Sequence, residues 1–298
     1  MDKISKSQVK MVRSLQQKKF RDELGLFVAE GEKCVSELLK SFDPELLIVS
    51  TDKSEFSSPP LRGEGLARSS VLWTVVEQIR GMSSILSASP TEIEQMSSLR
   101  TPQGVIAVFK KRPSQLSIVN SQLLIALDGI QDPGNLGTII RTCDWFGVHD
   151  IVCSLDTADC YNPKVVQATM GALSRVRVHY VNLPAWLESL SPSERGAGGV
   201  PNIFGTLLEG KNMYDVLADL TNSQLSMVNS QLSIIVMGNE GNGISPAVRS
   251  LVTHPIRIPS FPENAETSES LNVSIATAIV LAEFRRINNN HLQILNHQ

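Results

Sequence analysis

The sequence predicts an α/β protein of two domains, the second of which is built on a mostly parallel sheet. Short apolar runs alternate with stretches of helical periodicity in both halves of the chain. At 298 residues the chain is long enough for two hydrophobic cores. A polar, repetitive segment separates the halves. We therefore expect a first domain over residues 1–112, a linker over 113–122 and a second domain over 123–298.

The first domain reads as a compact α/β unit. Residues 5–20 have the spacing of an amphipathic helix, and a strand-like stretch then leads to Gly31, after which a second helical pattern begins. Further strands are expected at 46–50, 71–76 and 104–110, and further helices at 77–87 and 90–98.

The segment that separates the domains is repeated later in the chain. The text SQLSIVNSQL at 114–123 has a near copy, NSQLSMVNSQLS, at 222–233. Two independent core elements would not share such polar, low-complexity text, so we interpret both copies as inserted loop segments. The first of them serves as the linker.

The second domain again alternates strands and helices. Its short buried strands are LLIALDG, DIVCS, NIFGTLL and SIIVMG, and its helices are expected at 135–146, 162–174, 212–220 and 272–287. This alternation favours a mostly parallel sheet that is covered on both faces. In such sheets ligands bind beyond the carboxyl ends of the strands.

The composition is that of an ordinary soluble protein, with 42% hydrophobic and 19% charged residues. The apolar runs are too short to cross a membrane, and the basic N-terminus has no apolar stretch typical of a secretory signal, so we expect a cytoplasmic protein. The four cysteines show neither CxxC spacing nor a nearby histidine cluster. They predict reduced, partly buried thiols and no metal site.

The formal net charge of −3 conceals a basic N-terminus. The first 21 residues carry one acidic side chain, Asp2. They carry seven basic side chains: Lys3, Lys6, Lys10, Arg13, Lys18, Lys19 and Arg21. A second basic cluster lies at 110–112. Such clustering suits contact with phosphates, and a solvated helix face is an equally good interpretation from charge alone.

Three segments of the second domain carry polar residues at positions suited to chemistry. In the first, 127–148, a strand ends at Asp128, and a helix begins near Asn135 and carries Arg141. Exposed backbone N–H groups at such a helix start favour an anion. A P-loop is excluded because Asn135 and Leu136 replace the required Lys and Ser/Thr. Taken alone, a capping Asn and a surface Arg explain the segment equally well.

The other two segments also have plain structural interpretations when taken singly. In 233–245, three glycines with G-x-x-G-x-G spacing follow a strand and surround Glu240. This is not the dinucleotide fingerprint, and a tight turn with an exposed Glu would account for it. In 256–286, Ser270 and Asn272 stand in the first turn of a helix, where both residue types are common caps. That helix is unusually apolar, which indicates core or a subunit interface.

Together and in this order, the three segments resemble the SpoU/TrmH family of tRNA and rRNA ribose 2′-O-methyltransferases. The resemblance lies in N-x-x-x-x-x-R-T-C, then G-N-E-G-x-G-I-S, then I-P followed by S-L-N-V-S-I-A. The first domain resembles the substrate-binding domain of many members through FVAEGEKCV at 27–35 and TPQGVIAV at 101–108. The resemblance implies an α/β trefoil-knot (SPOUT) catalytic domain, a homodimer, and S-adenosylmethionine as cofactor.

The resemblance also implies roles for individual residues. The catalytic set would be Asn135, Arg141, Glu240, Ser270 and Asn272, and the cofactor would be held by Thr206, Gly238, Ile258 and Leu271. We expect Arg141 to position a phosphate and stabilise an oxyanion, because a guanidinium normally stays protonated. The residues expected to contact RNA are Lys18, Lys19, Arg21 and Lys33. We expect rRNA rather than tRNA, because simpler tRNA-directed members often lack the first domain.

One departure from the family pattern and three alternatives remain. The segment SFPENAET, 260–267, is longer and more acidic than the short link usual in the family. The alternatives are a catalytically silent RNA-binding or assembly protein of the same fold, a methyltransferase acting on a base, and a generic nucleotide-binding enzyme. The sequence names neither the RNA nor the nucleotide.

Overall fold

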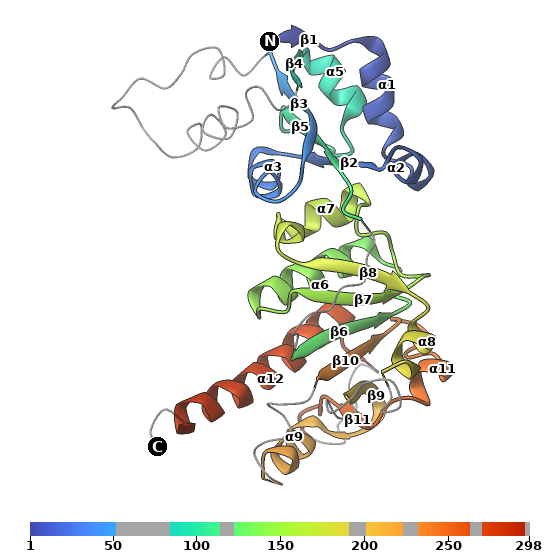
Figure 1. The fold of residues 1–298 in the computed structure, drawn as a ribbon, viewed down its shortest axis with the longest axis vertical. Helices are drawn as coiled ribbons and strands as arrows, with labels where there is room; N and C mark the ends of the chain where they lie inside the picture. Colours follow the sequence, from blue (N-terminus) through green and yellow to red (C-terminus); the bar gives the residue numbers. More distant parts are fainter. Residues whose placement is uncertain (52–83, 114–121, 191–200, 223–231, 263–269, 296–298) are drawn as a thin grey trace. The chain divides into compact units, whose positions relative to one another are not determined.

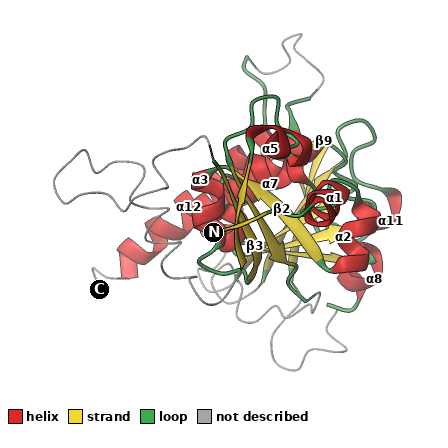
Figure 2. Cartoon of the chain, turned by 90° about the horizontal axis from the view of Figure 1, so that it is seen from above, coloured by secondary structure: helices red, strands yellow, loops and turns green. Residues whose placement is uncertain are grey.

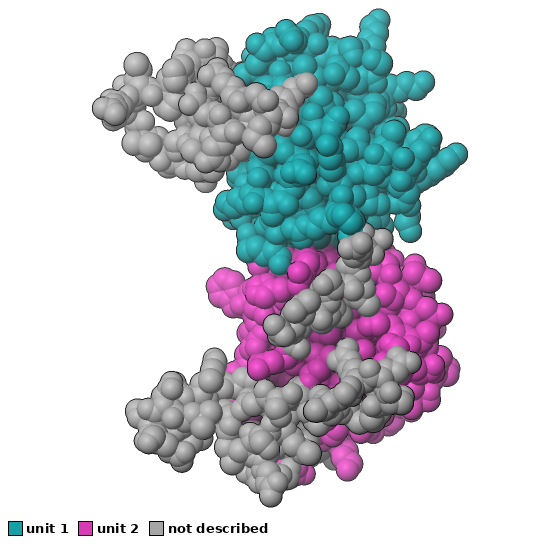
Figure 3. All heavy atoms as spheres, viewed as in Figure 1, with its two compact units in different colours: residues 1–113, 159–175 teal, residues 114–158, 176–298 magenta. Residues whose placement is uncertain are grey.

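A computed structural model describes residues 1–51, 84–113, 122–190, 201–222, 232–262 and 270–295 (Figure 1). The chain divides into two compact units (Figure 3). The first combines residues 1–113 with 159–175, and the second combines 114–158 with 176–298. Residues 159–175 thus pack with the first unit, although in sequence they follow the first two strands of the second.

The first unit contains a mixed five-stranded sheet in the order β1-β4-β3-β5-β2. Its strands are β1 (Asp2–Lys3), β2 (Leu26–Glu30), β3 (Pro44–Ser50), β4 (Ser84–Ala88) and β5 (Val105–Lys110). The β1, β4 and β3 strands run parallel, and β5 is antiparallel to both of its neighbours.

Helices cover both faces of this sheet. The helices are α1 (Lys6–Ser14), α2 (Lys18–Leu24), α3 (Glu32–Leu38), α5 (Pro90–Met96), α7 (Pro163–Thr169) and the 3-10 turn η2 (Ala172–Ser174). On one face, α1 and α5 bury Val12 and Ile93 against the strands. On the other, α3 and α7 contact β2, and the ring of Tyr161 packs on Phe27 with 4.7 Å between ring centroids. The segment 159–175 therefore completes the core of the first unit.

The second unit contains a six-stranded sheet in the order β11-β9-β10-β6-β7-β8. Its strands are β6 (Leu123–Asp128), β7 (Asp150–Ser154), β8 (Arg177–Val181), β9 (Asn202–Asn212), β10 (Ser233–Gly238) and β11 (His254–Arg257). Every pairing between these strands is parallel. The prediction of a mostly parallel sheet is confirmed.

The two faces of this sheet are covered by different helices. The helices are α6 (Pro133–Trp145), α8 (Leu183–Glu188), α9 (Met213–Asn222), α11 (Pro246–Arg249) and α12 (Val273–Leu295). Alternate strand residues, such as Leu124 and Val236, form one core with Leu187 of α8 and Val248 of α11. The helix α6 packs against α12. Figure 2 shows α12 on one side of the strands and α8 and α11 on the other.

Two predicted elements of the first unit differ from the structure. The helix expected at 5–20 is interrupted, because the carbonyl oxygens of Leu15 and Gln16 accept hydrogen bonds from the Arg21 guanidinium (2.9 Å each). The helix expected at 77–87 is wrong at its end, where 84–88 form β4, whose Leu86 and Ala88 alternate into the core as the period of a strand requires.

Other predictions fall partly outside the described residues. The strand expected at 71–76, residues 114–121 of the linker, residues 223–231 of the second repeat and residues 263–267 of the acidic segment lie there. The four cysteines are all described and buried, and none of them forms a disulfide bond. In the described ranges no helix is long and apolar enough to span a membrane, and no group of side chains suited to a metal ion is found.

Candidate active site

The strand order of the second unit creates a switch point between β6 and β10. From β6 the chain adds β7 and β8 on one side, and then returns to place β9 and β10 on the other. Gly238 at the end of β10 pairs in register with Asp128 at the end of β6. Ligands of open parallel sheets bind beyond the strand ends at such a point, because the loops diverge there and leave space.

The turn after β6 delivers Asn135 to this point. Gly129 has a φ of +73°, which lets the chain turn sharply. Asp132 then caps α6, since its Oδ1 accepts a hydrogen bond of 2.8 Å from the backbone N–H of Asn135. Pro133 follows at the start of the helix, where its missing N–H costs nothing. The local sequence therefore fixes Asn135 in the first turn of α6.

The loop after β10 is organised by Asn239. Its Oδ1 accepts hydrogen bonds from the N–H groups of Gly241 and Asn242 (2.9 and 3.0 Å), and its Nδ2 donates to the carbonyl oxygen of Gly129 (2.7 Å). A Cβ at Gly238 would lie 2.3 Å from the carbonyl carbon of Gly243, so only glycine fits there. The loop is thus folded on itself and tied to the turn after β6.

Three of the five predicted catalytic residues meet at the switch point. The Nδ2 of Asn135 donates to Oε1 of Glu240 over 2.6 Å, and the Nδ2 of Asn272 donates to Oδ1 of Asn135 over 3.0 Å. Asn272 is held in turn by Ser274, whose backbone N–H and hydroxyl donate to its Oδ1. The loop after β10, the start of α6 and the start of α12 therefore converge on one carboxamide.

The other two predicted catalytic residues are not part of this contact. Arg141 is exposed, and it forms no ion pair or side-chain hydrogen bond with any residue that the structure describes. It stands six residues after Asn135, so it projects from a different side of α6. Glu240 pairs with Asn135 and forms no ion pair with Arg141. Ser270 is also exposed, two residues before Asn272.

The four predicted cofactor residues lie along the adjacent strands β11, β9 and β10 and at the start of α12. Gly238 ends β10, Ile258 directly follows β11, and Leu271 precedes α12 with 47% of its surface exposed. Thr206 of β9 donates to the carbonyl oxygen of Val236 (3.0 Å). The apolar side chains of Ile258 and Leu271 suit the ring of a nucleoside ligand.

At Thr206 the register of the sheet also shifts. Gly205 of β9 pairs with Pro255 of β11, and the next pair joins Lys211 to Ile256. Residues 206–210 are therefore left out of the pairing with β11. The interruption in the pairing therefore begins at Thr206, one of the residues expected to hold the cofactor.

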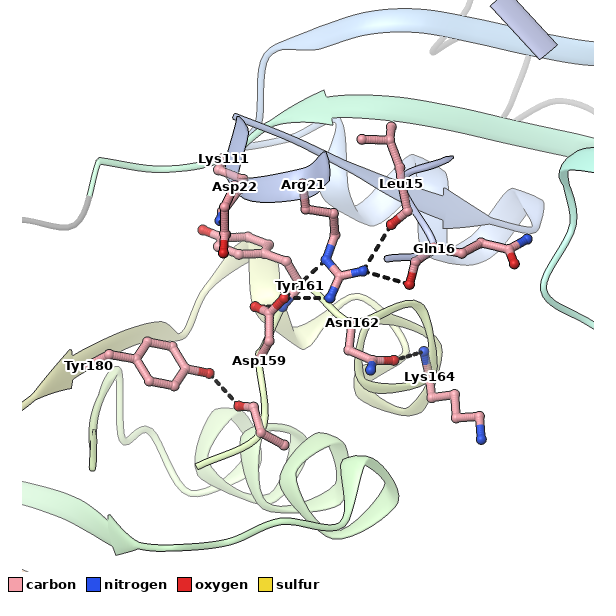
Figure 4. A network of polar contacts seen from close by, with 11 residues as sticks. Leu15, Gln16, Arg21, Asp22, Lys111, Asp159, Tyr161, Asn162, Lys164 and Tyr180 are labelled. Atoms are coloured by element: carbon pink, nitrogen blue, oxygen red, sulfur yellow. Dashed lines mark hydrogen bonds and ion pairs between the residues drawn. The ribbon is translucent and has the colours of Figure 1, made fainter. Parts of the chain in front are cut away.

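The predicted RNA contacts divide into exposed and buried side chains. Lys18, Lys19 and Lys33 are exposed. Arg21 is only 1% exposed: its Nε and one terminal nitrogen donate to Oδ2 of Asp159 (3.0 and 2.7 Å), and the other terminal nitrogen donates to two carbonyl oxygens (Figure 4). Arg21 is a core residue of the first unit, so the prediction that it contacts RNA is wrong.

The second basic cluster is also engaged within the first unit. Lys110 lies 3.8 Å from a carboxylate oxygen of Glu45, and Lys111 lies 2.6 Å from one of Asp22. The hydrogen bond from Lys111 holds the pKa of Asp22 below its usual value. Arg112 lies over the ring of Phe42. These cations are partly neutralised or stacked.

Sequence reasoning missed two residues that build the site. Asp132 could have been found, because an Asp directly before a Pro at a helix start is a capping signature. Asn239 could not, because its role depends on the carbonyl oxygen of Gly129, 110 residues away in the chain.

Two family models match this chain. Residues 122–282 match the SpoU rRNA Methylase family, and residues 6–107 match the MRM3-like substrate binding domain. The chain is 30% identical over 277 residues to the 23S rRNA (guanosine(2553)-2′-O)-methyltransferase RlmP of Bacillus subtilis, covering 93% of this chain and 95% of that one.

Solved structures give the same result. A protein of the TrmH family from Porphyromonas gingivalis is similar with a TM-score of 0.72 and 32% identity, over 95% of this chain and 98% of that one. An rRNA methyltransferase from Sinorhizobium meliloti, solved with S-adenosylmethionine bound, gives a TM-score of 0.74 and 27% identity, over 96% and 97%. The chain therefore belongs to the SpoU rRNA methylase family.

Proposed function

We propose that this chain transfers a methyl group from S-adenosylmethionine to a ribose 2′-hydroxyl of 23S rRNA in the cytoplasm. Residues 1–112 would bind the RNA and residues 123–298 would carry out the transfer. The observation that carries the proposal is the contact of Glu240, Asn135 and Asn272 at the switch point. The choice of rRNA is supported by the name of the Bacillus subtilis relative.

The reaction demands activation of a weak nucleophile. A ribose hydroxyl attacks poorly until its proton is drawn away, so the site must stabilise a developing alkoxide. Asn135, whose carboxamide is fixed by Glu240, would orient the ribose together with Ser270. Arg141 would position the phosphate and stabilise the oxyanion electrostatically.

The cofactor would lie beside these residues. When bound, S-adenosylmethionine supplies an activated methyl group on a sulfonium. Gly238, Ile258 and Leu271 would hold it through their backbones, with Thr206 beside them, and Asn272 would keep the start of α12 in place. A site of this kind acts by orienting the hydroxyl toward the methyl donor and by excluding water from it.

We further propose that the chain works as a homodimer that pairs the outer faces of α6 and α12. Trp145, four residues after Arg141 on the exposed side of α6, is 84% exposed, and Leu271 and Ile275 at the start of α12 are 47% and 53% exposed. Apolar side chains on two helices that pack together suit a subunit interface. Such a dimer would bring Arg141 to the interface.

The dimer is tested by light scattering on Trp145→Glu. We expect wild type at the mass of two chains and the variant at the mass of one, because a buried carboxylate in an apolar interface is strongly unfavourable. Leu24→Glu, which changes an exposed apolar residue of the first unit, is the matched control and should stay dimeric. A monomeric wild type would refute the proposal.

The activity is tested by mapping ribose methylation in total RNA from a deletion strain and its parent. We expect one 23S rRNA position to lose its methyl group and to regain it with the wild-type gene. Arg141→Ala should fail to restore it, while the purified variant binds S-adenosylmethionine with near wild-type affinity. A tRNA position would instead support the tRNA alternative. No lost position would favour a catalytically silent RNA-binding protein, and an active Arg141→Ala enzyme would refute the role of Arg141.

A further inference from the structure

The helix α1 presents three cations on one face. Lys6, Lys10 and Arg13 follow one another at intervals of four and three residues, and all three are exposed. Residues so spaced lie above one another on a helix. The buried residues Val9 and Val12 occupy the side that packs in the core of the first unit. The basic stripe, as we call Lys6, Lys10 and Arg13, therefore points away from the core.

Several exposed lysines elsewhere in the first unit have acidic partners. Lys3 lies 3.9 Å from Glu92, Lys40 lies 2.5 Å from Glu37, and Lys110 lies 3.8 Å from Glu45. In contrast, no side chain of the basic stripe forms an ion pair with a residue in the described ranges, and α1 contains no acidic residue. The positive charge of the stripe is thus not compensated by nearby carboxylates, unlike that of Lys3, Lys40 and Lys110.

The first two of these cations, Lys6 and Lys10, are unfavourable for the helix itself. Like charges four residues apart on a helix repel each other, as Lys6 and Lys10 do. Cations in the first turn also oppose the helix dipole, which favours negative charge there. A capping box between Ser5 and Gln8 offsets part of this cost. Residues that break local rules without a structural gain are expected at functional surfaces.

We propose that Lys6, Lys10 and Arg13 form a binding surface for the phosphate backbone of RNA. This inference rests on the proposed RNA substrate and assigns a place on the first unit for it. Phosphate contacts of this kind position the protein on RNA and strengthen binding without reading the sequence. The stripe lies on one face of a capped helix, which fixes the spacing of the three residues along the backbone.

The test compares two triple variants of the full chain. In the first, Lys6, Lys10 and Arg13 are all changed to Gln, which keeps the helix propensity. In the control, the paired residues Lys3, Lys40 and Lys110 are changed to Gln, which removes the same charge from the same unit. The probe is an unmodified transcript of the organism's own 23S rRNA, and its dissociation constant is measured over roughly a tenfold range of KCl concentration.

We expect the stripe variant to bind the transcript roughly tenfold to a hundredfold more weakly at low salt. The slope of log Kd against log salt should fall by about 2 to 3, since each lost phosphate contact removes about 0.7 to 1. The control should keep the wild-type slope. In methylation assays, the KM for RNA should rise, whereas kcat and the affinity for S-adenosylmethionine should stay unchanged.

Two outcomes would overturn the inference. The first is a wild-type slope of log Kd against log salt in the stripe variant, or a loss of RNA affinity in the control as large as that in the stripe variant. The second is full affinity for naked RNA combined with slow methylation of ribosomal particles, which would point to an acidic protein partner instead. If the wild-type protein transfers no methyl group but still binds the transcript through the stripe, the proposed function fails and this inference stands.

Discussion

Asn135 donates a hydrogen bond of 2.6 Å to Glu240, although 105 residues separate them in the chain. A carboxylate accepts hydrogen bonds and does not donate them, so Asn135 must turn its Nδ2 toward Glu240. Its Oδ1 is then left for Asn272, which donates to it over 3.0 Å. One carboxylate therefore sets the orientation of the polar group at the centre of the site.

Removal of that carboxylate should slow methyl transfer without abolishing cofactor binding. We expect Glu240→Ala to lower the single-turnover rate roughly a hundredfold, because a misplaced reacting group costs about that much. Glu240→Gln keeps an amide oxygen that can accept from Asn135 and should lose far less. Equal rates for the two variants would show that the hydrogen bond does not orient Asn135.

The hydrogen bond from Asn239 to Gly129 should matter separately from the shape of its own loop. Asn239→Asp keeps the oxygen that accepts from Gly241 and Asn242, but it places a second oxygen against the carbonyl of Gly129. We expect a roughly tenfold fall in kcat, and a loss of stability of about 1–2 kcal/mol in denaturant titration. Wild-type kcat in N239D would mean that the two loops need no such link.

The fold of the second unit followed from sequence more fully than its site did. Buried strands such as Ile234–Met237 are continuous apolar runs, which carry their own signal of a parallel sheet. The meeting of Asn135, Glu240 and Asn272 depends on the crossover that returns β10 beside β6, and no local pattern encodes that. The family resemblance, rather than periodicity, singled these residues out.

In the first unit, the sequence predicted strands correctly but misplaced individual residues. Its strands at 46–50 and 104–110 were predicted, but charge alone placed Arg21 at an RNA surface, and residues 159–175 were read as part of the second domain. Burial of Arg21 depends on Asp159, 138 residues away. Only the packed structure reveals such a partner.

The buried ion pair of Arg21 and Asp159 should be a major support of the first unit. Their side chains are 2% and 9% exposed. We expect Arg21→Met to cost about 3–5 kcal/mol, because it leaves a buried carboxylate without its partner. Arg100→Met, at an exposed position of the same unit, should change little. Scanning calorimetry measures both, and equal stability of the two variants would contradict this role.

Asp150 should make stability depend on pH in the acid range. Burial raises the pKa of its carboxyl, but hydrogen bonds from Arg177 and His179 outweigh this and leave the pKa lowered. A lowered folded-state pKa stabilises the protein at pH values above about 4, and this contribution is lost as the pH falls through the folded-state pKa.

Replacement of Asp150 by Asn provides the measurement. We expect the variant to be about 2 kcal/mol less stable than wild type at neutral pH, as is usual for hydrogen bonds to a charged group. The difference should shrink as the pH is lowered below about 4. Urea titrations over that range would contradict the assignment if the difference were independent of pH.

The most direct test of the proposed chemistry is nucleoside analysis of RNA methylated by the purified enzyme. An unmodified 23S rRNA transcript is incubated with S-adenosylmethionine, digested to nucleosides and examined by mass spectrometry. We expect a nucleoside methylated at the ribose 2′-oxygen with wild type, and none with Asn135→Ala. A methyl group on a base, or an undiminished yield with Asn135→Ala, would contradict ribose methylation at the site where Asn135, Glu240 and Asn272 meet.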